Sequence, residues 1–450
     1  MKQFIERSIV CRSGSIAGDV EAVYFKIAKR IIPFLALLFV MAWLDRYNLG
    51  FAKLQMVKEL GFSEAVYGFG AGIVYFGYML FEIPSNLLLE RIGARKTFAR
   101  ITILWGITSI ATMFVKTAAW FYIVRFLLGS FEAGLFPGVI LYLTYWFPAR
   151  HRALMQALFT TSIPLSVILG APISGWIMGS LGGRAGLANW QWLFLLEGIP
   201  SIVVGLLALA IVADKPSQAG WLSEREKQLV LADLDADHVN AGLRTQRFRE
   251  AMTHPGVWLL TVIYFCATSS PVTIGFWIPS IIQSLGVNSN FKIGLLSAVP
   301  YIGAMIGMVL VGRHSDRTLE RRYHAAVGYL ISAIGLVGIG LFANRPALAF
   351  TALVIAVTAP LSGHQAFWQM PTTLLAGTAA ATGIALINSI GNLSGWLGPS
   401  VVGWLEDLTG KTSTGLYVVA GLEVLAATLI LFFMANGSVR PGETAPTCKT

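Results

Sequence analysis

Charged residues are scarce in this sequence. Of its 450 residues only 12% are charged and 55% are hydrophobic, and the mean hydropathy is +0.67. Soluble chains of this size carry about 25% charged residues, so the composition predicts an integral membrane protein. A net charge of +10 would suit a nucleic-acid binder. The placement of the basic residues, described below, is instead typical of a membrane topology, and no nucleic-acid partner is expected.

Cysteines are scarce as well. Cys11, Cys266 and Cys448 are too few and too scattered for a disulfide framework or a metal site. The sequence also shows no phosphate-binding loop and no nucleophile paired with a base, so we expect no enzymatic activity, no metal and no cofactor. A clean apolar core typical of a signal peptide is missing before Ile31, which predicts that the amino terminus stays in the cytoplasm.

Long apolar runs are abundant instead. A spanning helix needs about 20 mostly apolar residues, and the runs are too long and continuous for membrane strands. They predict an all-α membrane protein with 12 transmembrane helices. The expected spans are residues 29–50, 64–89, 98–116, 119–142, 153–179, 190–212, 255–283, 292–312, 325–343, 347–368, 380–403 and 413–435.

The only long polar stretch divides these spans into two groups of six. It contains Ser223 and Glu226 at capping-box spacing, which predicts a short amphipathic helix in a linker. The expected parts are a cytoplasmic tail (1–24), a six-helix bundle (25–212), a cytoplasmic linker (213–254), a second six-helix bundle (255–436) and a cytoplasmic tail (437–450).

The basic residues predict the orientation. Of the 33 Lys and Arg residues, 24 fall in the tails and loops expected on the cytoplasmic side, and Arg46 and Arg125 fall inside helices. Such a bias predicts that both termini lie inside. The remaining 7 are assigned to external loops: Lys53, Lys58, Lys116, Arg184, Lys292, Arg345 and Lys411.

Two short sequence blocks recur in both halves. "ERIGARK" (Glu90–Lys96) has a counterpart 226 residues later in "DRTLERR" (Asp316–Arg322). "LGAPISGW" (Leu169–Trp176) has one 228 residues later in "LGPSVVGW" (Leu397–Trp404), and its small residues predict close helix packing. The near-equal offsets predict a duplicated six-helix half with pseudo-twofold symmetry. Transporters have this architecture, with a substrate site near the membrane midplane between the halves.

The first pair of blocks resembles the cytoplasmic signature of the major facilitator superfamily. The motifs are "NLLLERIGARK" and "VGRHSDRTLERR", although the usual Gly-x-x-x-Asp is replaced by Asn86 and Glu90. The resemblance implies that these loops stabilise one end of an alternating-access cycle. The residues to which it assigns this role are Glu90, Arg91, Arg95, Asp316 and Arg317.

Four further blocks narrow the resemblance. "LDRYNLGFA", "GYMLFEIPSNLLLERIGARK", "RFLLGSFEAGLFPG" and "PTTLLAGTAAATGIALINSIGNLSGWLGP" are similar to the anion:cation symporter family. The similarity is closest to its bacterial branch of tartrate and aromatic-acid (phthalate- or hydroxyphenylacetate-type) permeases. It implies a multi-pass protein of the bacterial cytoplasmic (inner) membrane.

Two of the expected helices, the first and the fourth, each contain an acidic and a basic residue. A charge at the bilayer centre costs about 2.5–3.5 kcal/mol even on a lenient scale, so each should face a cavity or a partner. Asp45 and Arg46 are about 100° apart on one helix, and Arg125 and Glu132 are about 10 Å apart along another. Each therefore needs a partner on a different helix. We predict that Asp45 pairs with Arg125, and Arg46 with Glu132.

These charges suggest how protons and an anion are coupled. Burial drives a carboxylate toward its neutral form, while a nearby guanidinium holds it as the anion. A proton on Asp45 or Glu132 would free Arg46 or Arg125 to bind an anionic substrate, and the coupling works in both directions. The family resemblance implies the same roles for these four positions. The alternative is two buried ion pairs that only hold the helices together.

Several other residues are predicted to line the site or to support it. Tyr47, beside Asp45 and Arg46, either lines the site or only packs against neighbouring side chains. His364 either takes part in proton transfer or only forms a hydrogen bond to a neighbouring helix. Glu197 and Glu423 are predicted to be structural, with Glu423 facing away from the transport path. The predicted substrate-binding residues, besides the two arginines, are Tyr78, Gln365, Trp368, Asn388 and Asn392.

Together these features predict a monomeric, proton-coupled symporter that imports a small organic carboxylate, using the proton gradient as its energy source. The substrate is expected to be an aromatic acid such as phthalate or a tartrate-like acid. Some relatives carry a glutamine in the fifth helix, where this chain has "TTSIP" (Thr160–Pro164), and this departure favours a substrate less polyhydroxylated than a sugar acid. An efflux antiporter of the same fold and a non-transporting sensor on a transporter scaffold are the alternatives.

Overall fold

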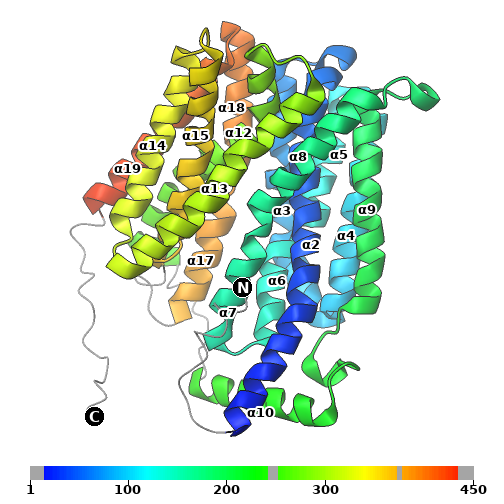
Figure 1. Cartoon of the computed structure of the whole chain (residues 1–450), viewed down its shortest axis with the longest axis vertical. Helices are drawn as coiled ribbons and strands as arrows, with labels where there is room; N and C mark the ends of the chain where they lie inside the picture. The colour runs from blue at the N-terminus through cyan, green and yellow to red at the C-terminus, as the bar shows by residue number, and fades with distance from the viewer. Residues whose placement is uncertain (1–14, 242–251, 372–377, 434–450) are drawn as a thin grey trace. The chain divides into compact units, whose positions relative to one another are not determined.

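A computed structural model describes residues 15–241, 252–371 and 378–433, and within them all regular secondary structure is helical. Cys11, Cys448, the first 14 residues of the expected amino-terminal tail and the carboxy-terminal tail lie outside the described residues. The helices are α2 (Ser15–Leu60), α3 (Glu64–Ile92), α4 (Ala94–Ala111), η1 (Thr112–Phe114), α5 (Ala118–Glu132), α6 (Leu135–Trp146), α7 (Ala149–Thr160), α8 (Ser162–Ser180), η2 (Arg184–Gly186), α9 (Asn189–Ile211), η3 (Pro216–Gln218), α10 (Glu224–Ala241), α12 (Pro255–Ser284), α13 (Asn290–Thr318), α14 (Arg322–Leu341), α15 (Pro346–Phe367), α17 (Thr378–Gly391), α18 (Ser394–Thr409) and α19 (Thr412–Phe433) (Figure 1).

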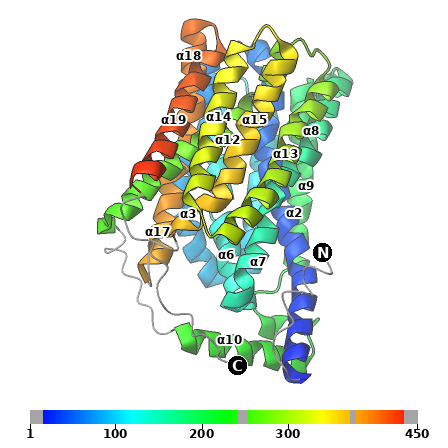
Figure 2. The ribbon, with the colours of Figure 1, turned by 60° about the vertical axis from the view of Figure 1, so that its left-hand side comes forward.

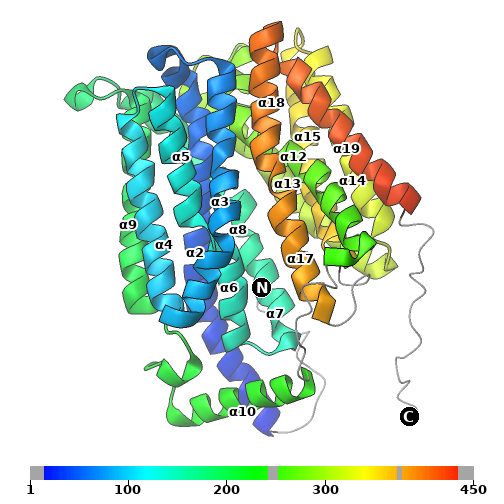
Figure 3. The same ribbon diagram turned by 180° about the vertical axis from the view of Figure 1, so that it is seen from behind.

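The predicted all-α membrane fold is confirmed. Among the described residues, eleven helical stretches are long and apolar enough to cross a membrane. The eleventh predicted span, residues 380–403, is broken between α17 and α18, which follow one another along one line (Figure 3). The fourth span is also interrupted, because Gly134 has a φ of +88° and separates α5 from α6. Glycine adopts this left-handed conformation without the steric cost that other residues incur.

The first helix is much longer than predicted. It continues through Lys53 and Lys58 to Leu60, so these two lysines are helical rather than part of a loop, and their external side stays a prediction. Lys and Glu are good helix formers, and their charges therefore do not end a helix. The end comes at Gly61, whose φ of +66° places it in the left-handed conformation common after the last helical residue.

The linker contains the predicted capped helix, α10. The Ser223 amide donates to Glu226 Oε2 (2.8 Å), and the Glu226 amide donates to Ser223 Oγ (3.3 Å), which completes a capping box. Two contacts join α10 to the first turns of α2, from Lys26 to Glu226 (2.8 Å) and from the Tyr24 hydroxyl to Asp233 (2.8 Å). Figure 1 shows α10 crossing beneath this end of α2. The linker is thus attached to the first helix by its side chains.

The chain forms two compact units. The first comprises Met1–Asn48, Phe76–Gly170 and Ser180–Leu243, and the second comprises Leu49–Tyr75, Ala171–Gly179 and Arg244–Thr450. Within the first unit α4 packs along α9. Within the second, α14 packs between α15 and α19, and α13 packs on α15 (Figure 2). The second unit therefore includes the ends of three helices from the first half of the sequence.

Glycines allow two helices of the second unit to touch backbone to backbone. An added Cβ at Gly68 in α3 would collide with the carbonyl oxygen of Pro399 in α18. One at Gly403 in α18 would collide with the carbonyl oxygen of Glu64. Small residues that permit such an approach are typical of helix contacts in membranes.

A second crossing repeats this geometry with the other copy of each sequence block. Gly175 in α8 lies against the carbonyl oxygen of Asn290, and Gly294 in α13 lies against the carbonyl oxygen of Ala171. The α8 residues precede their counterparts in α18 by 228 positions, and the α13 residues follow theirs in α3 by 226. These are the offsets of the repeated blocks. The predicted close packing in "LGAPISGW" is confirmed, and the duplication is visible as paired helix contacts.

We expect Gly403→Ala to destabilise the protein. Its added methyl would lie 2.9 Å from the carbonyl carbon of Glu64 and 3.2 Å from Gly68 Cα, so backbone must move. Overpacking of this kind costs about 1–3 kcal/mol. Gly421→Ala in α19 is the matched control, because an added Cβ there meets nothing within 4 Å and alanine favours helix. Thermal unfolding should show a lower Tm for Gly403→Ala alone, and equal Tm values would contradict the close approach.

Candidate functional site

The four charges predicted inside the membrane lie together in the first unit. Asp45 and Arg46 are on α2, and Arg125 and Glu132 are on α5. All four side chains are buried, and Arg125 is only 1% exposed. Because such charges are costly away from water, their partners define what the cluster can do.

Arg46 and Glu132 form a bidentate ion pair, which confirms the predicted contact. Arg46 Nε lies 2.9 Å from Glu132 Oε2, and Arg46 Nη2 lies 2.9 Å from Oε1. The guanidinium also lies over the rings of Trp43 (5.1 Å) and Tyr78 (5.2 Å). A planar guanidinium suits two parallel hydrogen bonds to a carboxylate. Tyr78, a predicted site residue, therefore lies beside this pair.

The predicted pair between Asp45 and Arg125 is wrong. Asp45 instead accepts hydrogen bonds from Trp105 Nε1 (2.8 Å), Ser109 Oγ (2.9 Å) and Ser201 Oγ (2.8 Å). An ionised carboxylate has room for about four hydrogen bonds, so neutral donors can occupy its oxygens in place of a guanidinium. Nothing in the sequence indicated that α4 and α9 would bring these three donors to α2.

The two buried carboxyl groups therefore have different surroundings. Glu132 interacts electrostatically with Arg125 as well as with its bidentate partner Arg46. Asp45 interacts electrostatically with Glu132 but is held by neutral side chains. Glu132 is thus held by guanidinium groups and Asp45 by neutral hydrogen-bond donors, and their predicted role in proton coupling stays a prediction.

The other predicted substrate-binding residues lie in the second unit. The Trp368 ring packs against Tyr264 with the centroids 4.8 Å apart. Asn392 donates to Asn388 Oδ1 (3.1 Å), so these two amides bind each other. Gln365, near the end of α15, is partly buried. Their predicted role in binding stays a prediction.

The two loops with the superfamily signature are described separately. At the start of α4 the Arg95 amide donates to Asp214 Oδ1 (2.8 Å). Glu90 and Arg91 are exposed at the end of α3. In the second-half loop, Asp316 pairs with Arg321 (2.8 Å), and Arg317 is exposed. Their predicted gating role stays a prediction.

Sequence reasoning missed a charged cluster around Lys53. Its Nζ lies 2.6 Å from Glu64 Oε2 and 3.9 Å from Glu406 Oε2, and only 7% of the residue is exposed. The amine also lies over the rings of Tyr67 (4.8 Å) and Trp277 (4.6 Å). The cluster joins α2 and α3 of the first half to α12 and α18 of the second half, within one compact unit.

Neighbouring contacts reinforce this cluster. Trp277 Nε1 donates to Glu406 Oε2 (2.9 Å). Asp407 accepts hydrogen bonds from the amides of Glu64 and Ala65 (both 2.9 Å) at the start of α3. Although burial alone would raise the pKa of Asp407, these bonds hold it below its ordinary value. The signal in the sequence was a lysine only seven positions after Arg46, in a segment that stays apolar.

We expect Lys53→Met to destabilise the protein, because Glu64 and Glu406 would lose the cation they share. Removing one partner of a buried ion pair costs about 3–5 kcal/mol of stability, whereas an exposed pair contributes about 1 kcal/mol. Because the two carboxylates are partly exposed, we expect Lys53→Met to lower the free energy of unfolding by about 2 kcal/mol. Thermal unfolding measures the loss. Lys58→Met, on the exposed end of the same helix, is the control and should be near neutral. A Lys53→Met protein as stable as the control would contradict the assignment.

Comparison with known proteins identifies the class. The chain matches the family model of the Major Facilitator Superfamily over residues 35–399. It therefore belongs to the major facilitator superfamily of membrane transporters, as the loop signatures predicted. A solved structure of a bacterial homologue of the human lysosomal transporter Spinster, inward-facing and occupied, shares this fold. Its TM-score is 0.74 at 16% identity, covering 89% of this chain and 95% of the other.

Two relatives at higher identity carry functional names. A "Putative tartrate transporter" of Agrobacterium vitis is 45% identical over 96% of this chain and 95% of its own length. A "Quinolone resistance transporter" of Acinetobacter baumannii is 38% identical over 92% of this chain and 95% of its own length. The chain is thus similar over nearly its full length to transporters of small molecules.

Proposed function

We propose that this chain is a proton-coupled symporter that imports a small organic carboxylate by alternating access. The observation that carries the proposal is the bidentate pair of Arg46 with Glu132, buried beside Arg125. A guanidinium held in this way already binds a carboxylate with the geometry that a carboxylate substrate would offer. Glu132 is then an internal substitute for the substrate anion.

Protonation of Glu132 would weaken its contact with Arg46. When Glu132 takes up a proton it loses its charge, and its contact with Arg46 weakens because the attraction between opposite charges is lost and the protonated oxygen no longer accepts as well. Arg46 and Arg125 keep their charge in either case. The protonated state therefore favours binding of a carboxylate from outside, and linkage requires that the bound carboxylate also favours the proton.

Asp45 is the second proton site of the proposal. Its carboxylate depends on three neutral donors from α4 and α9, Trp105, Ser109 and Ser201. These donors stabilise the charged form in its buried position. Protonation would weaken all three bonds and so loosen the contact of α2 with α4 and α9. Asp45 thereby links proton uptake to helix packing, whereas Glu132 links it to anion binding.

Tartrate-like acids are the substrate class that we favour. The 45% identical relative bears a tartrate transporter's name, and two buried arginines in one cluster suit a molecule with two carboxylates. An aromatic acid such as phthalate meets the same requirement. The proposal includes localisation in the bacterial inner membrane, which the family resemblance implies. It also places both termini in the cytoplasm, as the distribution of basic residues predicts.

Uptake of labelled tartrate into proteoliposomes tests the coupling. With an inward proton gradient, we expect the parent protein to accumulate tartrate. Glu132→Gln should no longer accumulate it, because glutamine cannot ionise, but should still exchange tartrate across the membrane. Asp45→Asn should also lose accumulation. Glu224→Gln, an exposed change of the same kind on α10, should behave as the parent does. Accumulation by both the Glu132 and the Asp45 variants would refute the scheme.

Arginine substitutions test the ligand assignment separately. Arg46→Lys keeps the charge but loses the planar fork, and one charge-assisted hydrogen bond is worth about 1.5 kcal/mol, so tartrate should bind about tenfold more weakly. Titration of purified protein measures this Kd, with phthalate and hydroxyphenylacetate as further probes. Unchanged Kd values in both Arg46→Lys and Arg125→Lys would show that the anion binds elsewhere.

Efflux is a second candidate, favoured by the relative named a quinolone resistance transporter. An antiporter would expel its substrate as protons enter. In inside-out vesicles acidified within, an efflux antiporter fills with substrate, whereas a symporter loses it. A sensor that only binds its ligand would accumulate nothing in either orientation.

A further inference from the structure

A second buried carboxyl group lies outside the cluster used above. Glu423 in α19 is 0% exposed, and among the described residues neither of its oxygens has a hydrogen-bond partner. It was predicted to be structural and to face away from the transport path. Its carboxyl lies in the interior of the second unit, next to α12 and α14, where it interacts with Ser270, Cys266 and Tyr329, and its position relative to the transport path stays a prediction.

The side chains next to Glu423 make it an unusual place for a charge. No basic residue of the described chain pairs with it. The hydroxyl of Ser270 is adjacent but not in hydrogen-bond geometry with the carboxyl; its Oγ lies 3.3 Å from Ser332 Oγ, which in turn donates to the carbonyl of Ala356 (3.2 Å). An ionised carboxylate without a partner in such surroundings is strongly disfavoured.

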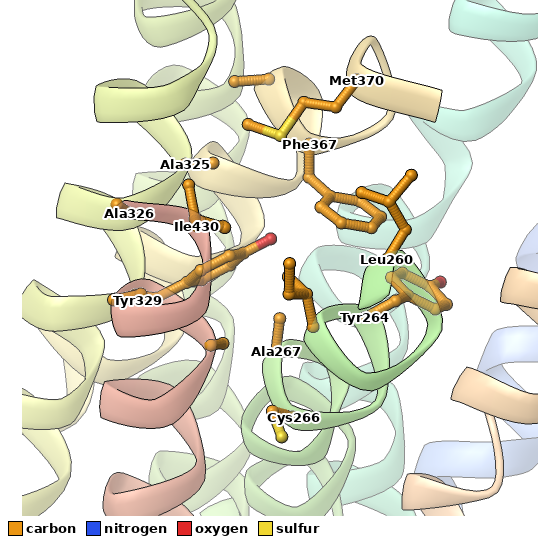
Figure 4. Close-up of a cluster of buried hydrophobic side chains, with 14 of the residues drawn as sticks. Leu260, Tyr264, Cys266, Ala267, Ala325, Ala326, Tyr329, Phe367, Met370 and Ile430 are labelled. Carbon is orange, nitrogen blue, oxygen red and sulfur yellow. The ribbon is translucent and has the colours of Figure 1, made fainter. Parts of the chain in front are cut away.

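Tyr329 is a second buried polar group without a partner at the same place. The residue is 0% exposed, and its hydroxyl makes no hydrogen bond within the described residues. Figure 4 shows the ring extending from α14 into a cluster of apolar side chains, with its oxygen at the inner end. A buried hydroxyl left unsatisfied costs about 1–3 kcal/mol, so its presence calls for a role other than packing.

The ring of His364, which is partly exposed, packs against Tyr329. Its Nδ1 lies 2.8 Å from the carbonyl oxygen of Pro360. A carbonyl can only accept, so Nδ1 carries the hydrogen and Nε2 of the neutral ring is an acceptor. The ring meets that of Tyr329 edge-on, with centroids 5.6 Å apart. His364, Tyr329 and Glu423 thus follow one another across α15, α14 and α19.

A proton suits this cluster better than a metal cation does. Hard cations in proteins need about six oxygen ligands, whereas the hydroxyls of Ser270 and Ser332 are already bound to each other. A proton needs one carboxyl oxygen. The remaining titratable groups that face the cluster are the Cys266 thiol and the Tyr264 hydroxyl of α12, and neither is a cation.

We propose that Glu423 is a reversible proton-binding site of the second half, which exchanges its proton with His364 through the hydroxyl of Tyr329. In the structure the Tyr329 hydroxyl is hydrogen-bonded to neither group, so the exchange requires a side-chain movement that brings it within hydrogen-bond distance of both. Glu423 then gives a proton to the Tyr329 oxygen, and the hydroxyl gives its own proton to His364 Nε2. The carboxyl becomes an anion, the tyrosine is unchanged and the imidazole becomes a cation, which supplies the opposite charge that the ionised carboxyl otherwise lacks. This inference goes beyond the proposed function, whose proton sites lie only in the first half, and it depends on neither the substrate nor the direction of transport.

Infrared difference spectra of the full chain in lipid vesicles, recorded between buffers of rising pH, test the site. The parent should show a band of a buried protonated carboxyl that fades as the pH rises. Glu423→Gln should lack that band, and Glu224→Gln, the exposed control, should retain it. If Glu423→Gln does not fold, Glu423→Asp should shift the band rather than remove it.

A second pair of variants tests the path. After a pH jump the band should fade at least tenfold more slowly in Tyr329→Phe, which keeps the ring and removes the hydroxyl. Tyr323→Phe, an exposed tyrosine on the same helix, should match the parent. A parent without the band, or with a band that persists at every pH at which the protein stays folded, overturns the proton site. Equal rates in the two tyrosine variants overturn the path through Tyr329.

Discussion

The structure depends above all on the cost of placing a charge where water cannot reach it. In a chain with so few charged residues, each one inside a membrane helix needs a partner, and the partners are what bring particular helices together. Arg46 meets Glu132 across α2 and α5, and Asp45 draws α4 and α9 toward α2 through three neutral donors. The same groups that organise the first unit are therefore the ones available for proton and anion binding.

The same constraint acts differently in the second unit. Lys53 is satisfied by two carboxylates and two aromatic rings, and so connects helices from both halves of the sequence. Glu423 has no such partner. A carboxyl group in that position avoids the cost of burial by holding a proton, which makes it a different kind of site from the ion pairs.

Duplication of the sequence accounts for the helix contacts that contain no charge. The two glycine crossings of the second unit use corresponding positions of both halves and the same backbone approach. An ancestral six-helix unit with glycines at these places would produce both. This explains why small residues recur at nearly constant offsets, although the surrounding side chains differ.

Much of the fold could be predicted from the sequence. Apolar runs of sufficient length located most spanning helices to within a few residues. For example, the predicted span 255–283 corresponds to α12 (Pro255–Ser284). The boundaries that failed were those set by local backbone conformation. The continuation of α2 through Lys53 and the break between α17 and α18 are two boundaries that hydropathy did not predict.

The sequence by itself determined the class of protein, the repeat and the identity of the four buried charges, because hydropathy, spacing and residue type are local properties. Only the tertiary structure decided which groups meet. It paired Arg46 with Glu132 but gave Asp45 three neutral donors in place of Arg125, and it turned Glu423 inward toward Tyr329. Hydrogen bonds form between helices far apart in the chain, and their geometry depends on helix rotation and on packing distances that no local pattern records.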